Sequence, residues 1–445
     1  MSRFRPTRRI VLARLLTGIS TLALASLLSA ATQLSAQDRL VQDGRNLFTR
    51  TFKVSEGFGY RLGQPELVLF ERQLGPDAKT CLECHNLGGV GGGAGNRKNV
   101  WVGIDPGLER RIERANIRNS TALWGGGAVQ ALAQEMSTEL QSQRQQAKER
   151  ARATGEAVTV DLASKGIAFG QLTALPLGDL DLTRLEGVDR DLVIRPFHAK
   201  GTRGTIRRFT QEAVWRHHGL ESPELLKRRY PLQGNWAQYD HDEDGVVNEF
   251  STRQITALSA FQAVLPTPQL VLPQDPIRRA QVRRGGQWFE ANCATCHVSH
   301  LALTKPEVTI ESAMGEPAPT LDLLKGYAGL PPVLQREDGK VKVALYSDLK
   351  RHDLGAGLAE ANGQLSDDKV TGVGPSVFIT TKLWGVADAP PYLHDGRAHT
   401  LPAAIVAHGG EAAAASKAFQ ALEPKEQEDL VLFLQSLKAP QLSRN

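Results

Sequence analysis

The chain has 445 residues, of which 41% are apolar and 23% charged, a composition typical of a globular protein of two or three domains rather than a disordered or collagen-like chain. Its formal net charge of +5 is carried by residues 1–36, which contain five arginines and no acidic residue. The remainder is neutral overall. This argues against nucleic acid as a partner, because such binding needs clustered, uncompensated Lys and Arg.

Residues 1–36 have the pattern of an export signal. A positively charged stretch that ends at Arg14 precedes an apolar run from Ile19 to Ala31, and small residues suited to cleavage follow. The apolar run is shorter than the 18 or so residues that an uncleaved membrane anchor, the alternative, would need. We therefore predict a cleaved signal peptide over residues 1–36, no stable membrane span in the mature chain, and a periplasmic location.

The four cysteines lie in two copies of the pattern C-x-x-C-H, at residues 81–85 and 293–297. Two thiols at this spacing can form thioethers with the two vinyl groups of one porphyrin, and the next residue places an imidazole under the iron. A thioredoxin-like redox pair or a zinc site would not require a histidine after each second cysteine. We predict two covalently bound haem c groups, held by Cys81, Cys84, His85, Cys293, Cys296 and His297.

A second internal similarity follows each motif. Residues 119–125 and 379–385 agree at four of seven positions and share the sequence Leu-Trp-Gly, which indicates a duplication with one haem domain in each half. The glycine-rich stretch 88–95 lacks the Gly-Lys-Ser/Thr of a phosphate loop, so we expect a tight or flexible turn near the haem edge.

Several helices are expected from composition and spacing. Residues 135–152 and 223–229 are rich in charged helix formers and predict exposed helices. Residues 423–437 place leucines at helical spacing after Pro424 and predict a terminal helix packed on the second domain.

An acidic loop lies between the two motifs. Oxygen-bearing residues alternate at Asp240, Asp242 and Asp244 and are followed by Gly245, as at the start of an EF-hand calcium loop. The twelfth position is Ser251, so a bidentate carboxylate would have to come from Glu249 or from elsewhere. The sequence leaves a calcium site and a solvated acidic turn as alternatives.

These patterns define the expected organisation. The proline-rich stretch 266–276 suits a linker. We predict a mainly α fold of two cytochrome c-like haem domains in tandem, with long loops and few short strands. The signal peptide spans residues 1–36, the N-terminal haem domain with an insertion and the calcium loop spans 37–270, and the C-terminal haem domain spans 271–445.

Taken together, the motifs resemble a known family. The two C-x-x-C-H motifs, the Leu-Trp-Gly segments and the block Pro-Tyr-Leu-His-Asp-Gly-Arg at 391–397 are similar to the dihaem oxidoreductase branch of the bacterial dihaem cytochrome c peroxidase superfamily. Residues 346–355 and 408–411 fit the same branch. The resemblance covers roughly residues 60–440, and it implies the cofactor more clearly than the substrate.

The resemblance also implies roles for residues around each haem. In the peroxidases a distal methionine follows the Pro-Tyr-Phe-His-Asp-Gly block, and at the same offset this chain has His408. His408 is therefore implied as the second axial ligand of the haem held by His297. The alternative is a helix-end histidine bonded to the backbone. The counterpart of His394 lies near the haem edge, where it bonds a propionate or the backbone. His352 is a lesser candidate for the ligand.

No histidine or methionine stands at a matching offset for the first haem, which favours an open or water-bound iron at the reactive site. Glu135, eleven residues after Trp124, is the candidate catalytic acid/base, with an exposed helix-start glutamate as the alternative. Met136 is as readily a core residue, and Trp124 is either an electron stepping-stone or a packing residue. Calcium is implied too, because peroxidases of this superfamily carry one near the domain interface.

The expected function is an exported dihaem oxidoreductase that reduces hydrogen peroxide with electrons from a small redox donor protein, such as a monohaem cytochrome. An oxidase or oxygenase of an organic substrate, as in the dihaem rubber oxygenases, is one alternative. A plain dihaem electron-transfer cytochrome is the other, and a high-spin signal from one haem would distinguish an enzyme from a carrier.

Overall fold

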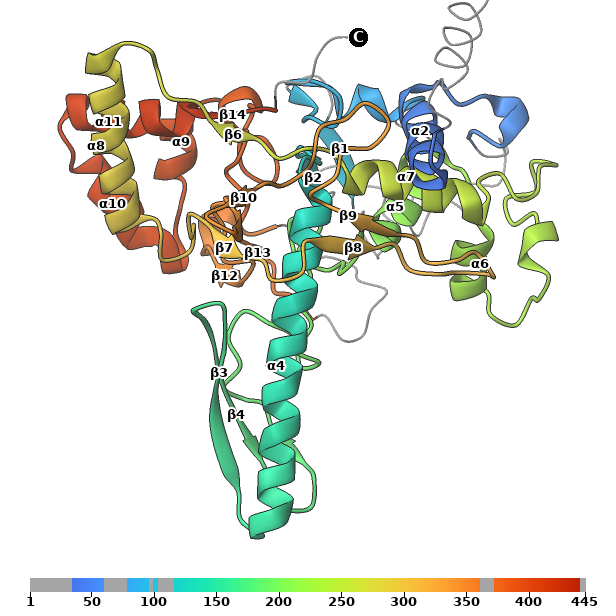
Figure 1. The fold of residues 1–445 in the computed structure, drawn as a ribbon, viewed down its shortest axis with the longest axis horizontal. Helices are drawn as coiled ribbons and strands as arrows, with labels where there is room; N and C mark the ends of the chain where they lie inside the picture. The colour runs from blue at the N-terminus through green and yellow to red at the C-terminus, as the bar shows by residue number, and fades with distance from the viewer. Residues whose placement is uncertain (1–33, 60–77, 96–98, 103–115, 361–371, 441–445) are drawn as a thin grey trace, which may run out of the picture.

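The computed structural model describes residues 34–59, 78–95, 99–102, 116–360 and 372–440 (Figure 1). Nearly all of the predicted signal peptide lies outside the described residues. No helix of the described part is both long and apolar enough to cross a membrane. The helices are α2 (Ala36–Thr49), α4 (Gly126–Thr154), α5 (Ile206–Ala213), α6 (Pro223–Arg229), α7 (Thr252–Ala263), α8 (Pro276–Asn292), α9 (Leu401–Val406), α10 (Ala413–Gln420) and α11 (Pro424–Gln435).

Two pairs of packed helices frame the molecule, and they lie on either side of α4 in Figure 1: α2 with α7, and α8 with α11. Each pair crosses at a glycine. A Cβ on Gly44 would overlap the carbonyl oxygen of Ala257, and a Cβ on Gly285 would overlap that of Asp429. The same close backbone approach is therefore used once in each half of the chain.

Local sequence explains where these helices begin. Ser35 caps α2 and forms a capping box with Asp38, while Asp275 caps α8 just before Pro276. The predicted linker between the halves falls between the end of α7 and the start of α8. The predicted terminal helix is confirmed as α11, with Glu423 at its N-cap. The helix expected at 223–229 forms as α6, but the prediction that it is exposed is wrong for its first turn, because residues 223–226 are buried.

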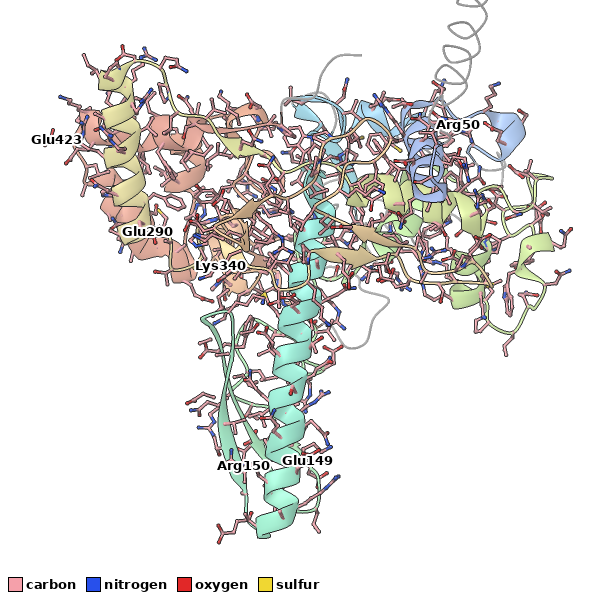
Figure 2. The ribbon with its side chains drawn as sticks, viewed as in Figure 1. Arg50, Glu149, Arg150, Glu290, Lys340 and Glu423 are labelled. Atoms are coloured by element: carbon pink, nitrogen blue, oxygen red, sulfur yellow. The ribbon has the colours of Figure 1, made fainter. Side chains whose placement is uncertain are left out.

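Helix α4 and the strands that follow it form an arm that projects from the body (Figure 1). Strands β3 (Val158–Ser164), β4 (Ile167–Ala174) and β5 (Leu180–Asp181) form an antiparallel sheet that packs against the helix. Figure 2 shows Glu149 and Arg150 near the far end of this arm. The helix expected over residues 135–152 is thus part of a longer one. Its first half is not exposed, because Ala128–Leu140 runs through the core with most of its side chains buried.

The remaining strands are short and pair locally. Strand β6 (Gln269–Leu270) in the linker pairs antiparallel with strand β14 (Leu437–Lys438), which follows α11. Helices and short strands are mixed, so the fold holds more strand than the mainly α prediction allowed. These strands are β1 (Asn99–Val102), β2 (Asn116–Asn119), β6 (Gln269–Leu270), β7 (Leu301–Ala302), β8 (Glu307–Thr309), β9 (Thr320–Asp322), β10 (Arg336–Glu337), β11 (Lys340–Val343), β12 (Arg351–Asp353), β13 (Val377–Ile379) and β14 (Leu437–Lys438).

The larger of the hydrophobic cores extends past the predicted domain boundary. It joins side chains of α2, α4 and α7 to Leu301, Val308, Leu321 and Val343 from the second half. A smaller core holds α8, α10 and α11 together, with Phe289 and Phe433 at its centre. The two halves therefore share packing and do not bury their apolar residues independently.

Candidate functional site

A cavity of about 840 Å³ lies between the two halves and is lined by both C-x-x-C-H histidines, His85 and His297. Trp124 and Trp384 of the two Leu-Trp-Gly segments also line it. The size is at the upper end of the range for cofactor sites in proteins. The structure thus brings together the two motifs that the sequence separates by more than 200 residues.

The first motif is held by a 3₁₀ turn, Cys81–Glu83, which Thr80 caps. The glycine-rich stretch after it is a tight turn in which Leu87 bridges Gly93. This turn brings the carbonyl oxygen of Gly92 to 3.1 Å from Nδ1 of His85. A Cβ on Gly92 would overlap the carbonyl oxygen of Leu87, so only glycine fits there. The turn fixes the ring of His85 through its Nδ1.

The second motif begins where α8 ends, at Cys293. His297 repeats the arrangement of the first motif, because its Nδ1 lies 3.0 Å from the carbonyl oxygen of Tyr346. Burial lowers the pKa of His85 and of His297 to about 4, so both imidazoles are neutral and can ligate a metal at physiological pH.

The cysteine environment disfavours thiolate chemistry. Burial raises the pKa of the Cys81 thiol to about 12 and that of Cys293 to about 11. A zinc site or a reactive redox pair needs thiolates, which a low-dielectric environment destabilises. A neutral thiol in each motif, next to a large cavity and followed by a histidine held through its Nδ1, fits covalent haem attachment.

The two Leu-Trp-Gly segments pack against each other. Gly125 and Gly385 both have φ near +70°, and a Cβ on either would overlap the indole of the opposite segment, Trp384 or Trp124 respectively. Trp124 also donates its indole N–H to the carbonyl oxygen of Val90 at 3.1 Å. The two indoles therefore lie close together in the middle of the molecule, at the wall of the cavity.

His408 lines the cavity just after α9 ends. Its Nδ1 lies 2.7 Å from the carbonyl oxygen of Ala404, which leaves Nε2 available. His297 and His408 line the same cavity. His408 is thus held as a proximal histidine is held. Its ligation stays a prediction.

The other two histidines that the sequence singled out in the second half, His394 and His352, have different surroundings. His394 lines the cavity with its ring stacked on Phe378 at 4.4 Å, and burial lowers its pKa to about 4. His352 lies between two carboxylates, with Nε2 2.8 Å from Asp348 and Nδ1 2.7 Å from Glu411. Burial opposes its charge, but these bonds outweigh burial and raise the pKa of His352 to about 11. Both of its nitrogens are engaged, so it is not placed to ligate iron.

The prediction that Glu135 is the catalytic acid/base is wrong. Glu135 does not line the cavity. Its carboxylate forms an ion pair with Lys165 at 2.7 Å and accepts hydrogen bonds from the backbone N–H groups of Thr304 and Lys305. Despite partial burial, these bonds lower its pKa, so Glu135 stays ionised and joins the arm to the second half. Met136 is fully buried in the core.

Sequence reasoning missed the residues that cover the first motif. Helix α5 continues into a π-helical turn, Val214–His218, and His217 from this turn lines the cavity together with His85. His198 lines it as well. The signal that could have revealed His198 is a second internal repeat, residues 196–205 and 391–400, in which few side chains are identical.

The acidic loop forms a separate cluster. Oxygens of Asp240, Asp242 and Asp244 lie within 4.8 Å of one another, and so do oxygens of Asp242, Glu249 and Glu221. Glu221 was not predicted. Burial and the neighbouring carboxylates raise the pKa of Glu249 to about 10, of Glu221 to about 8 and of Asp242 to about 7. Burial and mutual repulsion thus favour the protonated forms of these carboxyl groups unless a cation offsets their charge, as at a cation site.

Residues 260–437 match the family model described as "Di-haem oxidoreductase, putative peroxidase", which confirms the resemblance read from the motifs. No curated protein matches the chain. A solved hydrazine synthase of Kuenenia stuttgartiensis, pressurised with xenon, has 14% identity and a TM-score of 0.38, covering 98% of this chain and 100% of that one. A MauG-like protein associated with microbial copper homeostasis has 15% identity and a TM-score of 0.35, covering 92% and 90%. Scores this low do not establish a common fold.

Proposed function

From the di-haem oxidoreductase match of residues 260–437, we propose that the chain is an exported dihaem c-type enzyme that reduces hydrogen peroxide with electrons from a small redox protein. The observation that carries the proposal is one cavity lined by both His85 and His297. His408, at the offset that the resemblance implies for the second haem, lines the same cavity. When bound, two haems supply storage for two electrons and an iron that cleaves the O–O bond. The export signal of residues 1–36 supports a periplasmic location.

Some residues of the chain would bind the two haems, and others would conduct electrons between them. Cys81 and Cys84 would anchor one haem and Cys293 and Cys296 the other, and His85 and His297 would each bind the iron of one haem. The carbonyl acceptors on Nδ1 make these imidazoles stronger electron donors and hold their orientation.

The paired indoles provide the path between the two sites. Trp124 is fully buried, and Trp384 is 6% exposed. They come from equivalent segments and both touch the cavity that joins the motifs. Two aromatic groups that both lie against Gly125 and Gly385 shorten the distance that an electron must cross through saturated protein.

Peroxide reduction consumes two electrons and two protons and yields two molecules of water. The test uses the purified protein with both haems attached and reduced monohaem cytochrome c as the donor. We expect peroxide-dependent oxidation of the donor that is lost in His85→Ala. Turnover with oxygen and no peroxide would instead indicate an oxygenase. Two low-spin haems in every oxidation state, without turnover, would indicate an electron carrier.

The acidic cluster supports a calcium site as part of the same proposal. Glu249 is 8% exposed, one of its oxygens bonds the N–H of Glu221, and the other oxygen, Oε1, has no partner among the described residues. The charges that act on Glu249 come from Asp242, Glu221 and Asp244, which are all negative. A hard dication is the group that such buried oxygens accept.

This site ties the loop to the rest of the first half, because Glu221 precedes α6 and Glu249 precedes α7. Saturating Ca²⁺, at about one hundred times its Kd, should stabilise the protein by about 2.7 kcal/mol, a rise in Tm of about 2–4 °C over protein in EDTA. Glu249→Gln should abolish the response, whereas Glu243→Gln is the matched control. A Tm that is the same with Ca²⁺ and with EDTA would exclude calcium.

A further inference from the structure

The loop before α5 and the loop before α9 are two copies of one structure. Phe197 and Arg203 form an antiparallel bridge in the first copy, and Tyr392 and Ala398 form it in the second. A proline precedes each bridge, at positions 196 and 391. His198 follows Phe197 in the first copy, and Leu393 follows Tyr392 in the second. Both have a left-handed backbone, with φ of 66° at His198 and 71° at Leu393.

The equivalence extends into the helices. Thr205 caps α5 and Thr400 caps α9, each through its hydroxyl and the N–H three residues later. The two prolines and the two capping threonines are each separated by 195 residues, so the register does not slip anywhere in the repeat. A position in α5 can therefore be matched residue by residue to a position in and after α9.

At this register the counterpart of His408 is Ala213. Both residues line the cavity, His408 on the side of the second motif and Ala213 on the side of the first. Ala213 also lines the smaller cavity of about 50 Å³ that Cys81 and His85 border. The first site therefore has a methyl group where the second has an imidazole.

The segment around Ala213 also differs in its helical form. After Ala213 the backbone continues as a π-helical turn, a feature often found at functional sites. The turn carries His217, which lines both cavities together with His85. Burial is the main cause of the lowered pKa of His85, and a positive charge on His217 lowers it further, which places the two rings within electrostatic reach.

We propose that Ala213 leaves the coordination position opposite His85 open to a small exogenous ligand, and that His217 is the residue that exchanges protons with that ligand. The ligand class is a weak acid of two or three heavy atoms that binds through its conjugate base, such as hydrogen peroxide or hydrogen cyanide. His217 accepts the proton that the ligand loses on binding. With peroxide, His217 would return that proton to the departing oxygen as the O–O bond breaks, and that oxygen would leave as water. Two electrons from the haems and two protons from solvent would release the other oxygen as a second water. The inference rests on the proposed function in requiring a haem at His85.

The first experiment restores the missing imidazole. In the protein with both haems, Ala213→His should convert the haem of the first motif from high-spin to low-spin and abolish cyanide binding there. The double variant Ala213→His with His408→Ala should exchange the two spectra, so that the second haem becomes the high-spin, cyanide-binding one. Ala213→Met provides a thioether of different shape. If both single variants fold, retain two haems and still bind cyanide at the first haem, the assignment of Ala213 is wrong.

The second experiment concerns His217 and uses cyanide alone. His217→Gln should leave the first haem high-spin and slow cyanide association by about a hundredfold or more, the lower range for loss of a general base. His399→Gln, an exposed histidine outside the cavity, is the control and should bind cyanide at the wild-type rate. If His217→Gln instead converts a low-spin first haem to high-spin, His217 is itself a ligand and the proposal is overturned. An unchanged cyanide rate also overturns its proton-transfer role.

These readouts are independent of turnover. If cyanide binds as expected but peroxide oxidises no donor, the proposed function fails while the open site stands. If peroxide is turned over but Ala213→His changes neither spin state nor cyanide binding, the proposed function stands and this inference fails.

Discussion

In both halves of the molecule a phenylalanine from a glycine-crossed helix pair lies beside the histidine of the C-x-x-C-H motif. The ring centroids of Phe48 and His85 are 6.3 Å apart, and those of Phe289 and His297 are 6.4 Å apart. Each histidine directs Nδ1 to a backbone carbonyl at nearly the same distance, 3.1 and 3.0 Å. The phenylalanines that pack against these two rings also correspond. The ring centroid of Phe261 on α7 lies 5.3 Å from that of Phe48, and the ring centroid of Phe433 on α11 lies 5.1 Å from that of Phe289.

The segments that follow the repeated loops, by contrast, differ between the two halves. After the repeated loop, α9 leads to His408, whereas α5 has Ala213 and continues into a π-helical turn. The first half also carries the arm of α4 and its hairpin, which the second half lacks among its described residues. The surroundings of His85 and His297 are thus duplicated, whereas the segments that carry Ala213 and His408 differ. This supports the proposal that the two sites bind the same group and use it differently.

The largest effect should come from removing an attachment residue, since thioether formation needs the thiol itself. Cys81→Ala and Cys293→Ala should each lower the covalent haem content from two to one, measured by acid-acetone extraction of denatured protein. Because the two motifs are equivalent, the losses should be equal. Retention of both haems in either variant would remove the attachment assignment.

The next largest effect should separate the two sites. His408→Ala should convert the second haem from low-spin to partly high-spin and leave cyanide binding at the first haem unchanged, as measured by electronic absorption and EPR spectra. The matched control is His394→Gln, a cavity-lining histidine stacked on Phe378, which should keep the low-spin signal. An unchanged signal in His408→Ala would assign the sixth ligand to another cavity residue.

A smaller effect, on the free energy of unfolding, should show that the crossing of α2 with α7 and that of α8 with α11 are equivalent. Gly44→Ala and Gly285→Ala each place a methyl group against a backbone carbonyl of the partner helix. We expect each to lower the free energy of unfolding by about 1–3 kcal/mol, as overpacking does in other cores. Gly155→Ala is a control without steric contact, although its positive φ adds a small strain of its own. Loss in one crossing variant and none in the other, in denaturant titrations, would show that the two pairs differ in packing.

The smallest effect on the rate of catalysis should come from a substitution in the arm. Glu135→Gln removes the charge that pairs with Lys165 but touches no cavity-lining residue of the first site, so peroxide turnover should stay near the wild-type rate. The free energy of unfolding should fall by about 1–3 kcal/mol, the range for a hydrogen bond to a charged group. A large loss of turnover with unchanged stability would return Glu135 to the reaction.

Local patterns were enough to predict part of this site. The spacing of Cys81, Cys84 and His85 is set by covalent chemistry within five residues, and the motif histidines line the cavity as expected. The terminal helix and the linker were also predicted, because leucine spacing and prolines act over short distances. Glu135 was misassigned because a helical glutamate near Trp124 has many possible partners, and the partner it finds, Lys165, is on a hairpin with no visible signal.

The sequence alone determined which residues could hold haem, because thioether attachment and proximal ligation depend on neighbours in the chain. Only the tertiary structure showed which side chains share the cavity with the two motif histidines. Ala213 and His408 became comparable once the loops before α5 and α9 were seen to share a bridge, a left-handed residue and a threonine cap, although their side chains mostly differ. Glu221 likewise joined the acidic loop only through folding. Such sites are built by packing between distant segments, and packing depends on backbone geometry that few identical residues record.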